Sequence, residues 1–295
     1  MAETEVLRRF NRAWSQRVGL LEESYLGQGR TLGASRLLFE MGSEGAGVLE
    51  LRRRLGLDSG YLSRLLRGLE QERLVDVRPD PADARRRVVV PTAKGRRAVE
   101  RLEQRSEERA ARLIQPLGDS QRRRLADALA TAERLVRAAT CELEVVDAGS
   151  REALAAVDRY AAELAERFPT GFDPGDTAAD AASMNAPDGT FLVGRIDGAL
   201  AACGGVRRLT RTRAEIKRMW VDGAWRGCGL GGRMLGALES AARDLGYREV
   251  YLDTNSTLTE AIEMYDRAGY RRIERYNDNP YAGAWFAKRL PTRRR

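Results

Sequence analysis

The chain has 295 residues, 43% hydrophobic and 32% charged, which is enough for two domains with their own cores. It contains no histidine, which excludes a Ser-His-Asp triad and any histidine-held metal. The net charge is +8, and all of it lies in residues 1–140, which carry 28 Lys and Arg against 20 Asp and Glu.

Several classes of protein are excluded or disfavoured by simple patterns. No stretch approaches the ~18 uninterrupted apolar residues of a membrane span, and the opening MAETEVLRRF lacks the apolar run of a signal peptide. Cys141, Cys203 and Cys228 are scattered without metal-ligand spacing. We therefore expect a cytoplasmic protein with no metal and no membrane partner. The basic first half favours nucleic acid as a partner, the alternative being an arginine-rich surface that is only solvated.

Residues 5–139 have mostly helical periodicity, and a pair of short helices stands out within them. Residues 48–55 form a helix ended by Gly56, and Asp58 or Ser59 caps a second helix that runs to about Glu72. Two short helices joined by a glycine turn predict a helix-turn-helix.

The second of these helices has an apolar leucine face, and its other residues suit a DNA groove. Short hydroxyls and arginines bind phosphate oxygens and base edges. The segments LVDVR and RRVVVP then flank PDPADAR, which predicts a β-hairpin with a polar tip that can reach a minor groove. The candidate DNA-binding residues are Ser59, Tyr61, Ser63, Arg64 and Arg67 on the helix, and Arg85, Arg86 and Arg87 on the hairpin.

The segment LDSGYLSRLLRGLEQERLV, followed by Asp83-x-Arg85 and VVVPTAKG, resembles the MarR family of winged-helix regulators. The resemblance covers about residues 5–140, with Pro91 as a minor departure from the family's wing. It implies a mainly helical winged helix-turn-helix that binds double-stranded DNA as a homodimer. The helices over about residues 94–115 and 119–139 are available for the dimer interface.

The helical pattern ends at AATCELEVVDAGS, so we place a domain boundary near Thr140. Residues 141–295 alternate strands and helices and predict an α/β domain with a mixed sheet. Its expected strands are 142–146, 190–195, 198–207, 214–221, 248–254, 272–276 and 284–290, and its expected helices are 151–168, a short one within 169–188, 230–245 and 258–268.

Between a strand and a helix of this domain lies RGCGLGG, a glycine-rich turn that can bind phosphate. Glycines allow close approach of backbone N–H groups, the helix start adds unpaired donors, and Arg226 adds a positive charge. A P-loop would need Gly-Lys-Ser/Thr, and a dinucleotide-binding loop would need Gly-x-Gly-x-x-Gly at the first strand. The turn meets neither requirement, which leaves a plain connection or another kind of anion loop.

Arg226-Gly227-Cys228-Gly229-Leu230-Gly231 fits Arg/Gln-x-x-Gly-x-Gly/Ala and, with LDTNSTLTEAIEMYDRAGYRRI, resembles the GNAT family of N-acetyltransferases over about residues 142–290. The resemblance implies acetyl-CoA as co-substrate and an amine as acceptor. It assigns the CoA diphosphate to the loop and the pantetheine to the preceding strand, with Asn255 as a further contact. The implied cofactor-binding residues are Met219, Trp220, Val221, Arg226, Gly227, Cys228, Gly229, Leu230, Gly231, Gly232 and Asn255.

Two residues carry the implied chemistry. Tyr265 matches the family's general acid, the alternative being a ring packed on the sheet, and Glu215 matches the base of some members, the alternative being an ion-paired strand residue. Backbone N–H groups near Val221 are candidates to stabilise the acetyl oxygen. The acceptor wall is weakly marked, with candidates Asp173, Asp176, Asp180, Asn277, Asp278, Asn279 and Tyr281.

Three hypotheses for the whole chain follow. The first is a DNA-binding regulator fused to an acetyl-CoA-dependent N-acetyltransferase acting on a small amine, such as an amino acid, or on a protein amine. In the second, the C-terminal half senses acetyl-CoA or an amine without significant turnover. In the third, the winged helix docks proteins and never contacts DNA.

Overall fold

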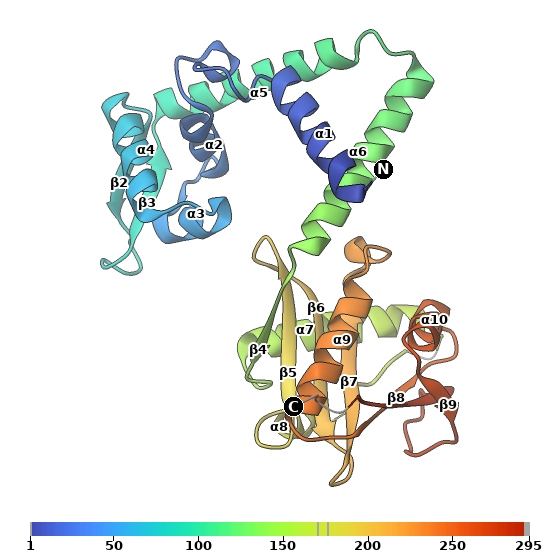
Figure 1. Cartoon of the computed structure of the whole chain (residues 1–295). Coiled ribbons are helices and arrows are strands. Elements are labelled where there is room, and N and C mark those ends of the chain that lie inside the picture. Colours follow the sequence, from blue (N-terminus) through green and yellow to red (C-terminus); the bar gives the residue numbers. More distant parts are fainter. Residues whose placement is uncertain (1, 170, 176, 292–295) are drawn as a thin grey trace. The chain divides into compact units, whose positions relative to one another are not determined.

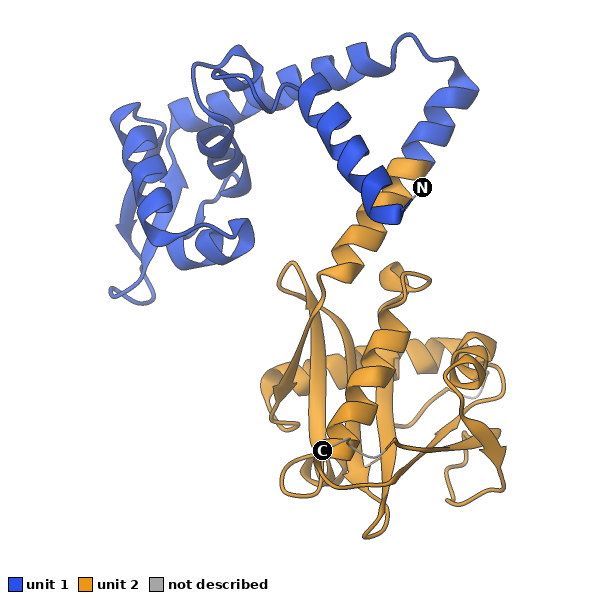
Figure 2. Cartoon of the chain, in the orientation of Figure 1, with its two compact units in different colours: residues 1–127 blue, residues 128–295 orange. Residues whose placement is uncertain are grey.

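The computed structural model describes residues 2–169, 171–175 and 177–291. The chain forms two compact units, residues 1–127 and 128–295, which are coloured separately in Figure 2. The helix α6 (Asp119–Ala139) begins in the first unit and ends in the second. The compact units therefore divide inside a helix, whereas the change of sequence pattern near Thr140 marks the end of that helix.

The first unit contains the predicted helix-turn-helix and wing. Gly56 ends α3 in the left-handed region at φ +62°, which a residue without Cβ adopts readily. Asp58 caps α4, because its carboxylate accepts a hydrogen bond from the Tyr61 backbone N–H at 2.8 Å. The elements are α1 (Glu3–Arg17), the 3₁₀ turn η1 (Tyr25–Gly27), α2 (Leu32–Glu40), β1 (Ala46–Gly47), α3 (Val48–Leu55), α4 (Ser59–Gln71), β2 (Val75–Pro79), β3 (Arg87–Pro91) and α5 (Ala93–Ile114).

A small sheet and the helices around it share one apolar core in this unit. The strand order is β1-β3-β2, and the two-residue β1 was not expected from the sequence because so short a strand has no periodicity. Buried leucines of α4 at three- and four-residue spacing pack against α2 and the wing strands, as the apolar face predicted. The core comprises Leu37, Leu38, Met41, Leu51, Leu62, Leu66, Leu69, Leu74, Val75, Val89 and Ala98.

The second unit is a seven-stranded mixed sheet with helices on both faces (Figure 1). The strand order is β4-β5-β6-β7-β8-β10-β9, and the β7–β8 pair is parallel while the other pairs are antiparallel. Its elements are β4 (Glu142–Val146), α7 (Arg151–Arg167), α8 (Thr177–Ser183), β5 (Thr190–Ile196), β6 (Ala199–Arg208), β7 (Arg213–Val221), η2 (Gly223–Trp225), α9 (Leu230–Asp244), β8 (Glu249–Thr254), α10 (Thr259–Arg267), β9 (Arg271–Ile273) and β10 (Ala284–Arg289).

Two features of β7 open a space in the middle of this sheet. The parallel pairing of β7 with β8 stops at Glu215 and Tyr251, although both strands continue beyond that point. The β6–β7 register also shifts, because Gly205 pairs with Lys217 whereas Cys203 pairs with Trp220. The extra residue makes a β-bulge, which bends the strand and redirects its side chains.

Candidate functional site

The glycine loop connects the end of β7, through η2, to the start of α9. Gly227 and Gly229 have φ values of +76° and +79°, which a residue with a Cβ adopts only under strain. The backbone N–H groups of the first turn of α9, from Leu230 on, have no partner within the helix. The loop therefore presents donors at a helix N-terminus, which is the arrangement that binds anionic groups.

Next to this loop lies a first cavity of about 670 Å³. Its walls come from α7, the end of β7, the loop and α10. Of the residues predicted to bind a cofactor, Cys228 packs at the edge of the core and Leu230 lies within it, 1% exposed. The predicted residues that line the first cavity are Met219, Trp220, Val221, Arg226, Gly227, Gly229, Gly231 and Gly232.

The guanidinium of Arg226 is directed into the first cavity and bonds to protein groups there. It pairs with the carboxylate of Glu163 on α7 and donates to the Val221 carbonyl at 3.2 Å. The Trp220 indole N–H donates to the same carboxylate at 2.8 Å. Burial alone would raise the pKa of Glu163, but these hydrogen bonds outweigh burial and lower it. Nε and Nη2 of Arg226 are thus bonded within the protein, and the loop's backbone amides are further donors that an anion could meet.

A second cavity of about 460 Å³ adjoins the first. It lies where β7 and β8 have parted, and its outer wall consists of Phe168, residues 172–175 and residues 279–281. The two cavities have lining residues in common, so a molecule in one cavity would contact a molecule in the other. The residues that line both cavities are Tyr160, Leu164, Met219, Leu258, Ala261 and Tyr265.

Tyr265 is thus at the junction of the two cavities. Its side chain is 7% exposed, and its ring packs near those of Tyr270 and Phe286, at centroid distances of 5.8 and 5.6 Å. Burial, reinforced by Tyr160 and Asp253, raises the pKa of the Tyr265 phenol above its ordinary value of about 10. The phenol therefore stays protonated through the neutral range and can donate its proton.

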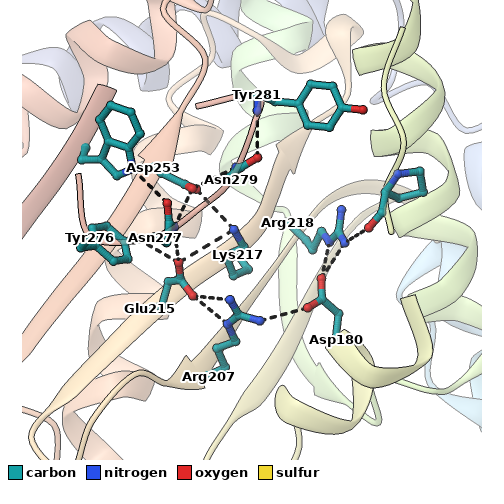
Figure 3. A network of polar contacts seen from close by, with 12 residues as sticks. Asp180, Arg207, Glu215, Lys217, Arg218, Asp253, Tyr276, Asn277, Asn279 and Tyr281 are labelled. Carbon is teal, nitrogen blue, oxygen red and sulfur yellow. Dashed lines mark hydrogen bonds and ion pairs between the residues drawn. The ribbon is translucent and has the colours of Figure 1, made fainter. Parts of the chain in front are cut away.

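Glu215 lies behind the second cavity and is 1% exposed. Figure 3 shows its carboxylate within a polar network, where it accepts a hydrogen bond from Arg207 Nε at 2.7 Å and lies 2.6 Å from Arg207 Nη2. It also accepts from the Tyr276 hydroxyl at 2.8 Å and from the Asn277 amide at 3.1 Å. Both carboxylate oxygens are therefore bonded, and this carboxylate lines neither cavity.

The network contains charged residues of the second cavity that the sequence analysis did not single out. Asp253, at the end of β8, has a 4% exposed side chain and lies 3.4 Å from the Lys217 ammonium. Arg218, on the bulge, has a φ of +54° and donates to Asp180 of α8. Asp253 lies two residues before Asn255 in the segment that resembles the GNAT family. Its position at the end of a strand could therefore have marked it as a candidate site residue. The bulge that turns Arg218 inward has no signal in the sequence.

The remaining predicted residues of this half lie near the second cavity or outside it. Asn255 lines the second cavity and donates to the Tyr281 carbonyl at 2.7 Å. Asp173, Asp180, Asn279 and Tyr281 line the same cavity, whereas Asp278 is fully exposed and pairs with Arg275. Asp176 is outside the described residues.

In the first unit, the predicted DNA-binding residues gather on α4 and the wing. Ser59, Ser63, Arg64 and Arg67 are exposed on α4, and Arg85, Arg86 and Arg87 are exposed at the wing. Tyr61 is half-buried and its hydroxyl lies against Gly33 of α2. Its ring lies under the Arg64 guanidinium, 5.7 Å from ring centroid to Arg64 Cζ, so it supports an exposed arginine.

Two absences concern the residues that the structure describes. No group of three or more Cys, Asp and Glu side chains there is arranged to hold a metal ion. No helix in the described part is long and apolar enough to cross a membrane.

Residues 157–270 match the model of the acetyltransferase (GNAT) family, and residues 28–86 match that of the MarR family. Over 115 residues the chain is 31% identical to the N-alpha-acetyltransferase RimI of Mycobacterium tuberculosis, covering 38% of this chain and 71% of that protein. The chain is a MarR–GNAT fusion. It belongs to the GNAT family through its second unit and carries a MarR-family winged helix in its first.

Two other proteins are similar to parts of the MarR–GNAT chain. An uncharacterized N-acetyltransferase of Escherichia coli, YjgM, is 27% identical over 128 residues, which cover 40% of this chain and 77% of that protein. A MarR-family regulator of Rhodococcus sp. is similar in structure, with a TM-score of 0.37 and 20% identity, over 45% of this chain and 95% of that one.

Proposed function

We propose that the GNAT unit transfers an acetyl group from acetyl-CoA to an amine and that the MarR unit binds double-stranded DNA. The observation that carries the first part is the pair of cavities that meet at Tyr265. One cavity is bordered by an anion-binding loop, and the other by charged and aromatic side chains. A transferase that joins two substrates needs such a shared boundary, because its catalysis consists largely of holding the reacting groups together.

The first cavity suits acetyl-CoA, whose thioester supplies the acetyl group. A Cβ added at Gly231 would lie 3.0 Å from the Met264 sulfur, so the wall there is close and a side chain would fill the space. The amides of residues 226–232 are assigned to the diphosphate. Met219, Trp220 and Val221 are assigned to the pantetheine, because they line the cavity beyond the loop.

In the second cavity, we assign the amine to the end of β8. Asp253 faces this cavity, and its carboxylate can accept a hydrogen bond from the amine and pass a proton to water. Glu215, which the sequence suggested as the base, lies behind it and is connected through Asn277, whose amide is 3.1 Å from Glu215 and 2.8 Å from Asp253. We therefore assign Glu215 an indirect part in proton removal, with Asp253 as the carboxylate next to the amine.

Tyr265 and the bulged strand complete the proposed chemistry. The Tyr265 phenol holds its proton at the junction of the cavities and can give it to the departing sulfur. Backbone N–H groups of the bulge near Val221 are candidates to stabilise the acetyl oxygen as it gains charge. Asn255 holds the Tyr281 carbonyl, so we assign it to the acceptor wall as well as to the cofactor contact that its position implied.

In the MarR unit, we assign α4 to the major groove and the wing to the adjacent minor groove. The exposed serines and arginines of α4 suit phosphates and base edges, and Arg85 to Arg87 suit a narrow groove of negative potential. We also infer a homodimer through the long helices. α1 supports this inference, because it has no buried residue and exposes Val6, Leu7 and Phe10 by 43%, 60% and 44%.

The test uses the full chain, acetyl-CoA and a panel of amines that includes amino acids and a peptide N-terminus. Thiol release is followed with and without duplex DNA from upstream of the chain's own gene. Release with at least one acceptor supports the enzyme. Binding of CoA and a change in DNA affinity without any release would favour a sensor instead. Absence of DNA binding would favour a docking role for the winged helix.

A further inference from the structure

The end of α6 lies against the glycine loop, although it precedes the region that matches the GNAT family model. Arg134 of α6 donates from Nη2 to the backbone carbonyl of Arg226 at 2.9 Å. One turn later, the Arg137 guanidinium lies over the Trp225 indole, 4.9 Å from the ring centroid. Trp225, the last residue of η2, and Arg226, the first residue of the loop, are therefore held by two arginines of one helix face, and all four residues belong to the second unit.

Arg137 and the end of α6 are themselves fixed in place. Arg137 pairs with Asp197 at 2.7 Å, in the turn between β5 and β6, and with Glu133 at 3.2 Å. Arg233, in the first turn of α9, donates to the backbone carbonyls of Ala139 at 3.2 Å and Cys141 at 2.9 Å. Carbonyls at and just after the end of α6, which have no partner within that helix, are thus bonded by α9, the helix that follows the loop.

The glycines of the loop have open space on one side. A Cβ added at Gly227, Gly229 or Gly232 would meet no atom within 4 Å. Glycine-rich backbone loses much conformational freedom when it is ordered. Fixing the loop before the ligand arrives removes part of that cost from binding.

We propose that Arg134 and Arg137 are positioning residues for acetyl-CoA, which hold the glycine loop in the conformation that receives the diphosphate. The proposal rests on the function assigned to the loop above. Arg137 acts through the Trp225 ring, since its charge is already balanced by Asp197. The end of α6 supports this loop, and the same helix begins in the other compact unit, the MarR half.

The experiment compares the full-length chain with Arg134→Ala, Arg137→Ala and the double variant, using CoA itself as the probe. The Kd for CoA is measured by calorimetry, and kcat and the KM for acetyl-CoA are measured with an accepted amine. We expect the double variant to raise both the Kd and the KM for acetyl-CoA about tenfold, each single variant contributing a few-fold. The kcat and the acceptor KM should stay within about twofold of wild type, because neither arginine lines a cavity.

The matched control is Arg124→Ala, an exposed arginine nearer the start of α6, which should change none of these constants. Arg134→Lys keeps a donor and Arg137→Lys keeps a cation over the ring, so these variants should recover part of the lost affinity. If the alanine variants lose thermal stability, the two lysine variants are used to test the proposal instead.

A Kd for CoA within twofold of wild type in a folded double variant would overturn the proposal while leaving the acetyltransferase function intact. Equal losses of kcat and of acceptor binding would also overturn it, because they would indicate a general loss of structure. If wild type bound no CoA at all, the function proposed for the loop and this inference would both fail.

Discussion

The buried carboxylate of Glu215 accepts a hydrogen bond from Nε of Arg207 at 2.7 Å, and Nη2 of the same guanidinium lies 2.6 Å from the same oxygen. This charge-assisted contact holds the Arg207 side chain against Glu215. Asp180 pairs with Nη1 of Arg207 at 3.0 Å. The Tyr276 hydroxyl donates a hydrogen bond to the other carboxylate oxygen of Glu215. The arrangement anchors β6, β7 and the outer wall of the second cavity, and it gives Glu215 a structural part as well as its proposed place in proton removal.

Glu215→Gln should therefore lower the free energy of unfolding by about 2 kcal/mol. This is less than the ~3–5 kcal/mol for a fully buried pair, because Arg207 keeps Asp180 and is 29% exposed. Urea unfolding measures the difference. Asp253→Asn, which changes a carboxylate that faces the cavity, should instead lower kcat. If Glu215→Gln lost activity without losing stability, Glu215 would be the direct base.

Tyr265→Phe should lower kcat by about 100-fold, the lower end of the range for general acid catalysis, without abolishing turnover. Tyr247→Phe is the matched control, because its hydroxyl bonds to the Asp188 carbonyl outside both cavities. An unchanged kcat for Tyr265→Phe would exclude the acid role and leave the ring as a packing residue.

The rate of the wild-type enzyme should show no loss attributable to Tyr265 between pH 7 and about pH 10. The pKa of the buried phenol is raised, so its proton is lost only above the ordinary tyrosine value and the acid form persists through this range. The pH dependence of kcat in wild type and Tyr265→Phe measures this. A limb below pH 10 that disappears in the phenylalanine variant would contradict the raised pKa.

Gly231→Leu should raise the Kd for CoA at least about tenfold while leaving DNA affinity unchanged. The new side chain starts 3.0 Å from the Met264 sulfur and extends into the first cavity, so it competes with the ligand for space. Gly236→Leu, on the same helix with open space around it, is the control and should bind CoA normally. Normal CoA binding by Gly231→Leu would contradict the assignment of the diphosphate to this loop.

Arg85→Ala should reduce the slope of log affinity against log salt by about 1, which is the loss of one phosphate contact. Arg85 is exposed at the wing and bonds to Asp83 only through its backbone N–H. The exposed Arg211 of the GNAT unit provides the control substitution. Fluorescence anisotropy at several salt concentrations gives the slope. A salt-insensitive wild type would contradict the whole phosphate-contact assignment.

Local patterns in the chain were sufficient to predict most of the architecture. The leucine spacing of α4, the cap at Asp58, the hairpin around Asp83 and the order of strands and helices after Thr140 were confirmed. Such features depend on neighbours within a few residues, so periodicity and capping reveal them. The glycine loop and Tyr265 were also predicted, because they lie in short segments that resemble the GNAT family.

Only the tertiary structure decided how residues distant in sequence meet. The sequence alone suggested that the side chain of Arg226 binds a diphosphate. In the folded chain this side chain pairs with the carboxylate of Glu163 on α7. The inward turn of Arg218 depends on a bulge in the β6–β7 register, and the burial of Glu215 depends on three segments closing around it. The contact of Arg134 and Arg137 with the loop joins positions about ninety residues apart. Long-range packing sets these relationships, and no local periodicity encodes them.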